Sequence, residues 1–222
     1  MREFLQDSES SILGELTRGN SKANFCRLEK AQTDAWSTEI GTLKTCLSEL
    51  STGSPSVGNW GILLEYPIPR RQKRIDAVLL VGSIIVVIEF KCGLSQRVTE
   101  ASVQVEDYAL DLADFHEPSH KRTIIPIAVA HDAEVAPLGV AAAGVQPVLT
   151  APPSALARLL EDIRRDAPAR LGEPINVDGW NHGRYTPVPT VIEAALAIFA
   201  GMEVREIAHA HADAKNLTVT VD

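Results

Sequence analysis

The stretch RIDAVLLVGSIIVVIEFK, residues 74–91, contains two short runs of aliphatic and β-branched residues separated by Gly82 and Ser83. Such runs predict strands over 74–81 and 84–91, joined by a tight hairpin with glycine first, as a type II′ turn prefers. A similar run, GILLEYPI at 61–68, precedes them. Three consecutive strands separated by turn residues predict an antiparallel meander.

The patterns on either side of the meander predict helices that pack on its sheet. Trp36, Ile40, Leu43 and Leu47 follow one helical stripe, which predicts a helix over about 32–50. The further expected elements are a helix over 99–115, a strand over 123–130, a shorter strand near 146–149, a helix over about 153–165 and one or two helices over 188–207. Meander, helix and strand in this order predict an α/β sandwich in which a crossover helix covers the sheet.

Patterning along the chain predicts three parts. Residues 1–30 are polar, with a short apolar spacing that predicts one amphipathic helical extension, whereas residues 31–170 carry the α/β core. Residues 171–222 are expected to form a C-terminal loop and helices, with the aromatic-rich turn around Trp180 packed under a helix. The chain ends in NLTVTVD without a terminal cap, and we therefore expect a fragment of a longer protein.

Composition limits the class of protein. The 222 residues are 45% apolar and 23% charged, which fits one globular domain or a domain with an appended segment. A net charge of -8 argues against a polycation that coats nucleic acid by bulk charge, so any nucleic-acid contact must be local. Three widely spaced cysteines predict a reducing compartment. Because the sequence shows no signal peptide and no run of about 18 apolar residues, we expect a cytoplasmic protein with no membrane partner.

Three charged residues occur in the strands where burial is expected to be greatest. In IIVVIEFK both faces are otherwise apolar, and Glu89 and Lys91 point to the same face because they are two positions apart. If Gly82 and Ser83 are the turn residues, Asp76 lies opposite Glu89, with Cβ atoms about 4.5 to 5.5 Å apart. Charged residues in a buried strand are costly unless they are paired or useful.

Two opposed carboxylates repel each other, so they need a cation between them or a proton on one of them. A hard divalent ion, Mg²⁺ or Mn²⁺, suits two oxygen ligands and leaves coordination positions for water and a phosphate oxygen. Lys91, one pleat away, can face the same phosphate or the attacking water. The alternative is an Asp/Lys/Glu salt-bridge network that only closes the end of the hairpin.

Asp76, a short hairpin and then Glu89-Phe-Lys91 match the signature of the PD-(D/E)XK nuclease superfamily, and Gln104 and Tyr108 resemble the QxxxY motif of its RecB-like branch. The resemblance implies a restriction-endonuclease-like α/β/α sandwich with a central mixed sheet. It makes Asp76 and Glu89 metal ligands and Lys91 the residue that orients the water or stabilises the transition-state phosphate. Gln104 would touch the active-site water or Lys91, and Tyr108 would contact DNA or support Gln104.

A third acid often completes such a metal site. Glu65 is the first candidate because it lies in the phrase LLEYPIP on the strand before Asp76. Glu39 on the early helix is the second candidate, although an exposed helical glutamate needs no metal to explain it.

A basic run precedes the strand of Asp76. Arg70, Arg71, Lys73 and Arg74 place four cations within five residues, which is a local departure in an acidic protein. Such a run suits the phosphate contacts of a nucleic-acid-binding protein. A solvated loop whose charges keep a sheet edge from associating is the alternative.

The phrases LLEYPIPRRQKRIDAVLL, EFKCG, QVEDYALDLADFH and WNHGRYTPVPTVIEAA resemble the nuclease-like N-terminal region of a bacterial family in which a P-loop helicase/ATPase follows. This chain has no GxxxxGK[ST] and therefore no P-loop of its own. The resemblance implies a Mg²⁺-dependent nuclease, acting on DNA more readily than on RNA and coupled to a helicase domain in DNA processing or defence. A non-catalytic nucleic-acid-binding or scaffolding module of the same fold is the alternative.

Overall fold

The computed structural model describes residues 1–22, 30–69, 73–91, 98–138, 144–166 and 173–186. The chain divides into two compact units, Met1–Tyr185 and Thr186–Asp222. Apart from Thr186, the second unit lies outside the described residues, and so do the helices expected over 188–207. None of the described helices is long and apolar enough to cross a membrane.

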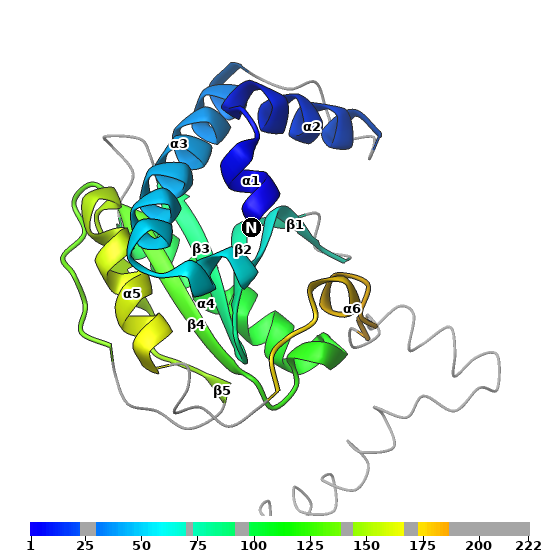
Figure 1. Cartoon of the computed structure of the whole chain (residues 1–222). Helices are drawn as coiled ribbons and strands as arrows, with labels where there is room; N and C mark the ends of the chain where they lie inside the picture. Colours follow the sequence, from blue (N-terminus) through cyan, green and yellow to red (C-terminus); the bar gives the residue numbers. More distant parts are fainter. Residues whose placement is uncertain (23–29, 70–72, 92–97, 139–143, 167–172, 187–222) are drawn as a thin grey trace, which may run out of the picture. The chain divides into compact units, whose positions relative to one another are not determined.

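A six-stranded mixed sheet forms the centre of the first unit (Figure 1). The strand order is β1-β2-β3-β4-β5, and β6 also pairs with β4. The first three strands pair antiparallel, which confirms the meander, whereas β4 runs parallel to β3, β5 and β6. The strands are β1 (Gly61–Ile68), β2 (Lys73–Val81), β3 (Ile84–Lys91), β4 (Thr123–Ala130), β5 (Gly144–Val145) and β6 (Leu149–Ala151).

Helices cover both faces of this sheet, so the predicted α/β sandwich is confirmed. Helix α4 (Val98–Phe115) connects the parallel strands β3 and β4, and a parallel pair needs such a crossover. Helices α3 (Lys30–Gly53) and α5 (Leu156–Asp166) pack together against the opposite face (Figure 1). The predicted stripe of α3 is buried there, with Ile40 only 1% exposed.

The β2–β3 hairpin has the predicted register. Val81 pairs with Ile84 and Ala77 with Ile88, and the positive φ of 62° at Gly82 is what the first position of a type II′ turn requires. Regular pairing between β2 and β3 stops at Ala77, whereas β3 stays paired to β4 to its end and β2 stays paired to β1 except at Asp76, which is skipped. The next facing positions in this register are Asp76 and Glu89.

Two expectations about short elements need correction. The N-terminal segment forms two helices, α1 (Arg2–Gln6) and α2 (Glu9–Lys22), because Ser8 begins a new helix by accepting the backbone N–H of Ser11. The single short strand expected near 146–149 is divided into β5 and β6. Pro147, which has no backbone N–H to donate, lies between them.

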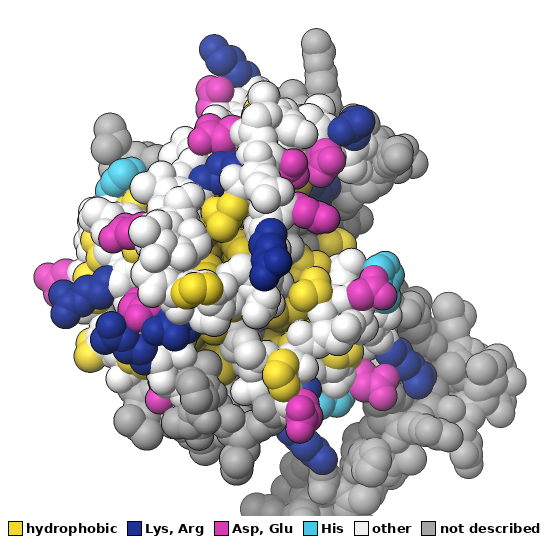
Figure 2. Space-filling view, in the orientation of Figure 1, with side chains coloured by type: hydrophobic (Ala, Val, Ile, Leu, Met, Phe, Trp, Pro, Cys, Tyr) yellow, Lys and Arg dark blue, Asp and Glu magenta, His cyan; other side chains and the backbone are white. Residues whose placement is uncertain are grey.

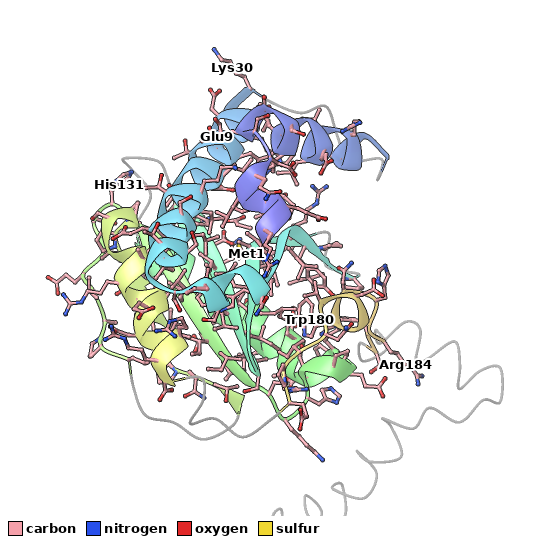
Figure 3. All side chains as sticks on the ribbon, viewed as in Figure 1. Met1, Glu9, Lys30, His131, Trp180 and Arg184 are labelled. Atoms are coloured by element: carbon pink, nitrogen blue, oxygen red, sulfur yellow. The ribbon has the colours of Figure 1, made fainter. Side chains whose placement is uncertain are left out.

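The segment after α5 packs on the same face of the sheet as α4. It contains the short helix α6 (Val177–Asn181), whose Trp180 is 1% exposed (Figure 3). The Trp180 ring lies 5.0 Å from that of Tyr66 on β1 and 4.6 Å from that of His116. The aromatic-rich turn therefore packs, as expected from the sequence.

Candidate metal centre

The open end of the β2–β3 hairpin brings three charged side chains together. The Asp76 carboxylate accepts a hydrogen bond from the backbone N–H of Phe90 at 2.8 Å. Beyond Ala77, a side chain of β2 therefore bonds to the backbone of β3 where a backbone carbonyl would otherwise do so. Glu89 is 2% exposed, and its Oε1 lies 3.0 Å from Nζ of Lys91. The predicted neighbourhood of Asp76, Glu89 and Lys91 is confirmed.

Two further acids join this end of the sheet from other elements. Glu39 comes from α3 and Glu65 from β1, and one carboxylate oxygen of each lies within 4.8 Å of the others and of an oxygen of Asp76. Oxygen atoms at these separations can coordinate one cation. The structure therefore brings both candidates for the third acid to the same place.

Electrostatics show that this acidic cluster is costly without a cation. Burial raises the pKa of Glu39 to about 8, and the charges of Glu65 and Glu89 act in the same direction. Burial and then the charge of Glu89 raise the pKa of Asp76 well above its usual range. Burial also raises the pKa of Glu89, although Lys91 acts against this shift. One or more of these carboxyls is thus expected to hold a proton at neutral pH.

Glu89 also has an oxygen without an ordinary hydrogen-bond donor. Its Oε2 is buried and no amide, ammonium or hydroxyl group of the described residues donates to it, while the Asp76 carboxyl forms a side-chain hydrogen bond with Glu89. Buried carboxylate oxygens are normally satisfied, so an unsatisfied one at an acidic cluster indicates that a partner is missing. A proton held by Asp76 or a bound cation would provide that partner.

A chain of hydrogen bonds leads from Lys91 to helix α4. Lys91 Nζ donates to Oε1 of Gln104 at 3.3 Å, and Gln104 Nε2 donates to the hydroxyl of Tyr108 at 2.7 Å. Gln104 thus points toward Lys91, which a purely structural salt bridge in the hairpin would not require. Tyr108 is 1% exposed, so it supports Gln104 and offers almost no surface to DNA.

The basic run is only partly described, because Arg70 and Arg71 lie outside the described residues. Lys73 is exposed, and its Nζ lies 5.9 Å from the ring centroid of Tyr108. Arg74 differs from the expectation of a phosphate contact, because its guanidinium donates to Glu65 at 3.3 Å and to Asn20 at 2.7 Å. On the face shown in Figure 2, Lys and Arg side chains lie among Asp and Glu side chains rather than in one basic patch.

Two residues at this centre were missed by reasoning from the sequence. Asn20 of α2 is 4% exposed and holds Arg74, and Trp36 of α3 donates a hydrogen bond that lowers the pKa of Glu65 against the raising effect of burial. Trp36 was identified only as part of an apolar stripe. Nothing in the local pattern around Asn20 indicates a partner 54 positions away.

Comparison of the chain with models of protein families finds no match. Comparison with curated proteins and with solved structures also finds none. What this centre can do must therefore be inferred from its own side chains.

Proposed function

We propose that this chain is a divalent-metal-dependent nuclease of the PD-(D/E)XK type that hydrolyses phosphodiester bonds. The observation that carries the proposal is the acidic cluster of Glu39, Glu65 and Asp76 beside the buried Glu89, whose Oε2 receives no hydrogen bond from an amide, ammonium or hydroxyl group of the described residues. Lys91 lies on the same strand face as Glu89 and supplies a fixed cation. A salt-bridge network would not need this excess of carboxylates over cations.

The donor atoms favour a hard divalent ion. All four acidic side chains offer oxygen, and carboxylate oxygens suit Mg²⁺ or Mn²⁺ rather than softer metals. Glu39, Glu65 and Asp76 would hold the ion, and the free oxygen of Glu89 would complete the set. Their raised pKa values fit this role, because ion binding replaces the protons that the carboxyls hold without it.

The proposed reaction is attack of water on phosphorus and loss of the leaving oxygen. A bound divalent ion lowers the pKa of water and neutralises charge on the phosphate. Lys91, held by Glu89 and Gln104, adds positive charge where the phosphate becomes more negative. Tyr108 accepts a hydrogen bond from Gln104 and so holds the Gln104 side chain in place. The ammonium group of Lys91 is thereby kept in one position. The water oxygen forms the new bond to phosphorus, and the proton that this water loses is taken up by the leaving oxygen.

We further propose DNA as the substrate and a helicase/ATPase domain as the partner in the full-length protein. Support for this part comes from the sequence phrases that resemble those of nuclease–helicase fusions. The exposed Lys73, beside Tyr108 and three positions before Asp76, supports this part, because it would contact a backbone phosphate of a substrate bound at the metal centre.

The deciding experiment is a cleavage assay on linear, circular and single-stranded DNA and on RNA, with Mg²⁺, Mn²⁺ or EDTA. We expect cleavage only with metal, and a loss of about 10² to 10³ in rate in Lys91→Ala. Lys30→Ala is the matched control, because Lys30 is an exposed lysine at the start of α3. This variant should cleave DNA as fast as wild type. Binding of DNA without cleavage of any substrate would contradict the nuclease and support the non-catalytic module.

A further inference from the structure

Arg74 joins the acidic cluster to helix α2. Its Nη1 lies 3.3 Å from Oε2 of Glu65, and its Nη2 lies 2.7 Å from Oδ1 of Asn20. The three groups are largely enclosed, since the side chains of Arg74 and Glu65 are 15% and 12% exposed and Asn20 is 4% exposed. These two contacts fix the orientation of the guanidinium.

Glu65 has an unusual backbone that needs such a support. Its φ is 50°, although it is neither glycine nor asparagine. Pairing of β1 with β2 is regular at Leu64 and again at Tyr66, and it skips Glu65 between them. Left-handed backbone at a non-glycine residue is strained and persists where surrounding structure enforces it, commonly at functional sites. The residue at this distortion has a carboxylate oxygen within 4.8 Å of oxygens of Asp76 and Glu39.

Stability alone does not account for the Arg74–Glu65 pair. Removing two charges from water costs about as much as their attraction returns, so a largely buried ion pair is weak evidence for a stabilising role. Arginine also does something here that lysine cannot. Its planar fork donates in two fixed directions at once, whereas an ammonium is a single point of charge.

We propose that Arg74 and Asn20 are positioning residues of the metal centre, which hold the Glu65 carboxylate in the direction needed to bind the divalent ion. Helix α2 is then part of the centre through Asn20, although it contributes no ligand. This proposal rests on the proposed function, because it assumes that the acidic cluster binds a divalent ion. It assigns Arg74 to the metal centre instead of to phosphate contacts.

The test measures binding of Mn²⁺ alone to the full 222-residue chain, by calorimetry and by the electron paramagnetic resonance signal of the ion. Replacing a residue that orients a metal ligand typically lowers metal affinity by about 10- to 100-fold. We expect losses of this size in Arg74→Lys and in Asn20→Leu. Asn20→Asp should retain near wild-type affinity, because its carboxylate still accepts from Arg74. Arg164→Lys is the matched control, since Arg164 forms a similar pair with Glu161 on α5, away from this cluster, and should leave the affinity unchanged.

The outcomes separate this proposal from the proposed function. If wild type binds no Mn²⁺, the metal centre itself is wrong. If wild type binds Mn²⁺ and both Arg74→Lys and Asn20→Leu bind it equally well, the positioning role is overturned while the metal centre stands. Urea unfolding of each variant checks that it folds. Should Arg74→Lys fail to fold, the comparison of Asn20→Leu with Asn20→Asp decides.

Discussion

The two ends of the β2–β3 hairpin are built from the same pair of strands and differ in almost every physical respect. At the turn end, Val81 and Ile84 pair regularly and are at most 1% exposed. At the open end, regular pairing has stopped, and Asp76 and Glu89 are enclosed with raised pKa values. One end of the hairpin contributes to the core, and the other carries two acids against the single cation of Lys91.

The difference teaches that the residues that stabilise the fold and the residues of the proposed metal centre lie at opposite ends of the β2–β3 hairpin. Apolar side chains at the turn end fix the register, and the register then places Asp76 opposite Glu89 without any further interaction. The open end costs free energy in the metal-free protein because like charges are buried together. Substitutions at the two ends are therefore expected to have opposite effects on folding and on ion binding.

The largest effect on folding is expected at the turn end. Ile85 is fully buried, and Ile85→Ala should lower the free energy of unfolding by about 2 to 5 kcal/mol, because it removes apolar contacts and leaves a cavity. Urea unfolding followed by circular dichroism measures this loss. Val103→Ala is the control, since Val103 is 59% exposed on α4 and should change little. Equal effects of the two variants would show that the turn end contributes no more to stability than an exposed position of α4.

At the open end, Asp76→Asn should abolish binding of the divalent ion while leaving the metal-free fold as stable as wild type or slightly more stable. The physical reason is that the amide cannot ionise, so it removes the cost of a second acid beside Glu89 and keeps the shape of the side chain. Calorimetry with Mn²⁺ and urea unfolding in EDTA measure the two quantities. Asp34→Asn, at an exposed position of α3, should change neither. A clear loss of stability in Asp76→Asn would instead favour the salt-bridge network.

The pH dependence of stability sharpens the same contrast. The pKa of Glu39 rises from 4.5 to about 8 in the folded protein, so the folded state keeps a proton that the unfolded state loses. The stability from this group is fully present below about pH 4.5 and is lost as the pH rises through about 8. Urea midpoints in EDTA should therefore fall between about pH 5 and pH 8, and Glu39→Gln should flatten that fall. A wild-type profile that rises over this range would contradict the raised pKa.

The smallest expected effect concerns substrate binding by the basic run of Arg70, Arg71 and Lys73. Each phosphate contact adds about 0.9 to the slope of log affinity against log salt for duplex DNA, or about 0.7 for a single strand. Replacing Arg70, Arg71 and Lys73 by Ala should flatten that slope by about two to three units and leave Mn²⁺ affinity unchanged. The control is the same titration with Lys30→Ala.

An unchanged salt slope in that triple variant would move the binding surface away from the basic run. The outer face of α4 is a poor substitute, because it exposes Glu100, Glu106 and Asp107. That outcome would leave the basic run as a feature that keeps the sheet edge from associating.

Much of the fold follows from local rules in the sequence. The β-branched runs predicted β1, β2, β3 and β4, and the stripe beginning at Trp36 predicted α3. The turn at Gly82 and the two-residue period of a strand predicted that Asp76 faces Glu89 with Lys91 on the same face. These inferences hold because hairpin geometry depends on few residues, all close together in the chain.

Longer-range features of the metal centre came only from the tertiary structure. The sequence offered Glu65 and Glu39 as competing third ligands, and the fold brings both to Asp76. It assigned Arg74 to phosphate, whereas in the fold Arg74 holds Glu65 and is held by Asn20.

The physical reason is the range of the interactions involved. Local backbone geometry and the alternation of apolar residues fix which side chains of one hairpin face each other, and the sequence by itself determined that much. Which helix approaches the open end, and whether Glu65 adopts a left-handed backbone there, depends on packing between elements tens of residues apart. Only the tertiary structure decided those contacts, because no pattern within a single element encodes them.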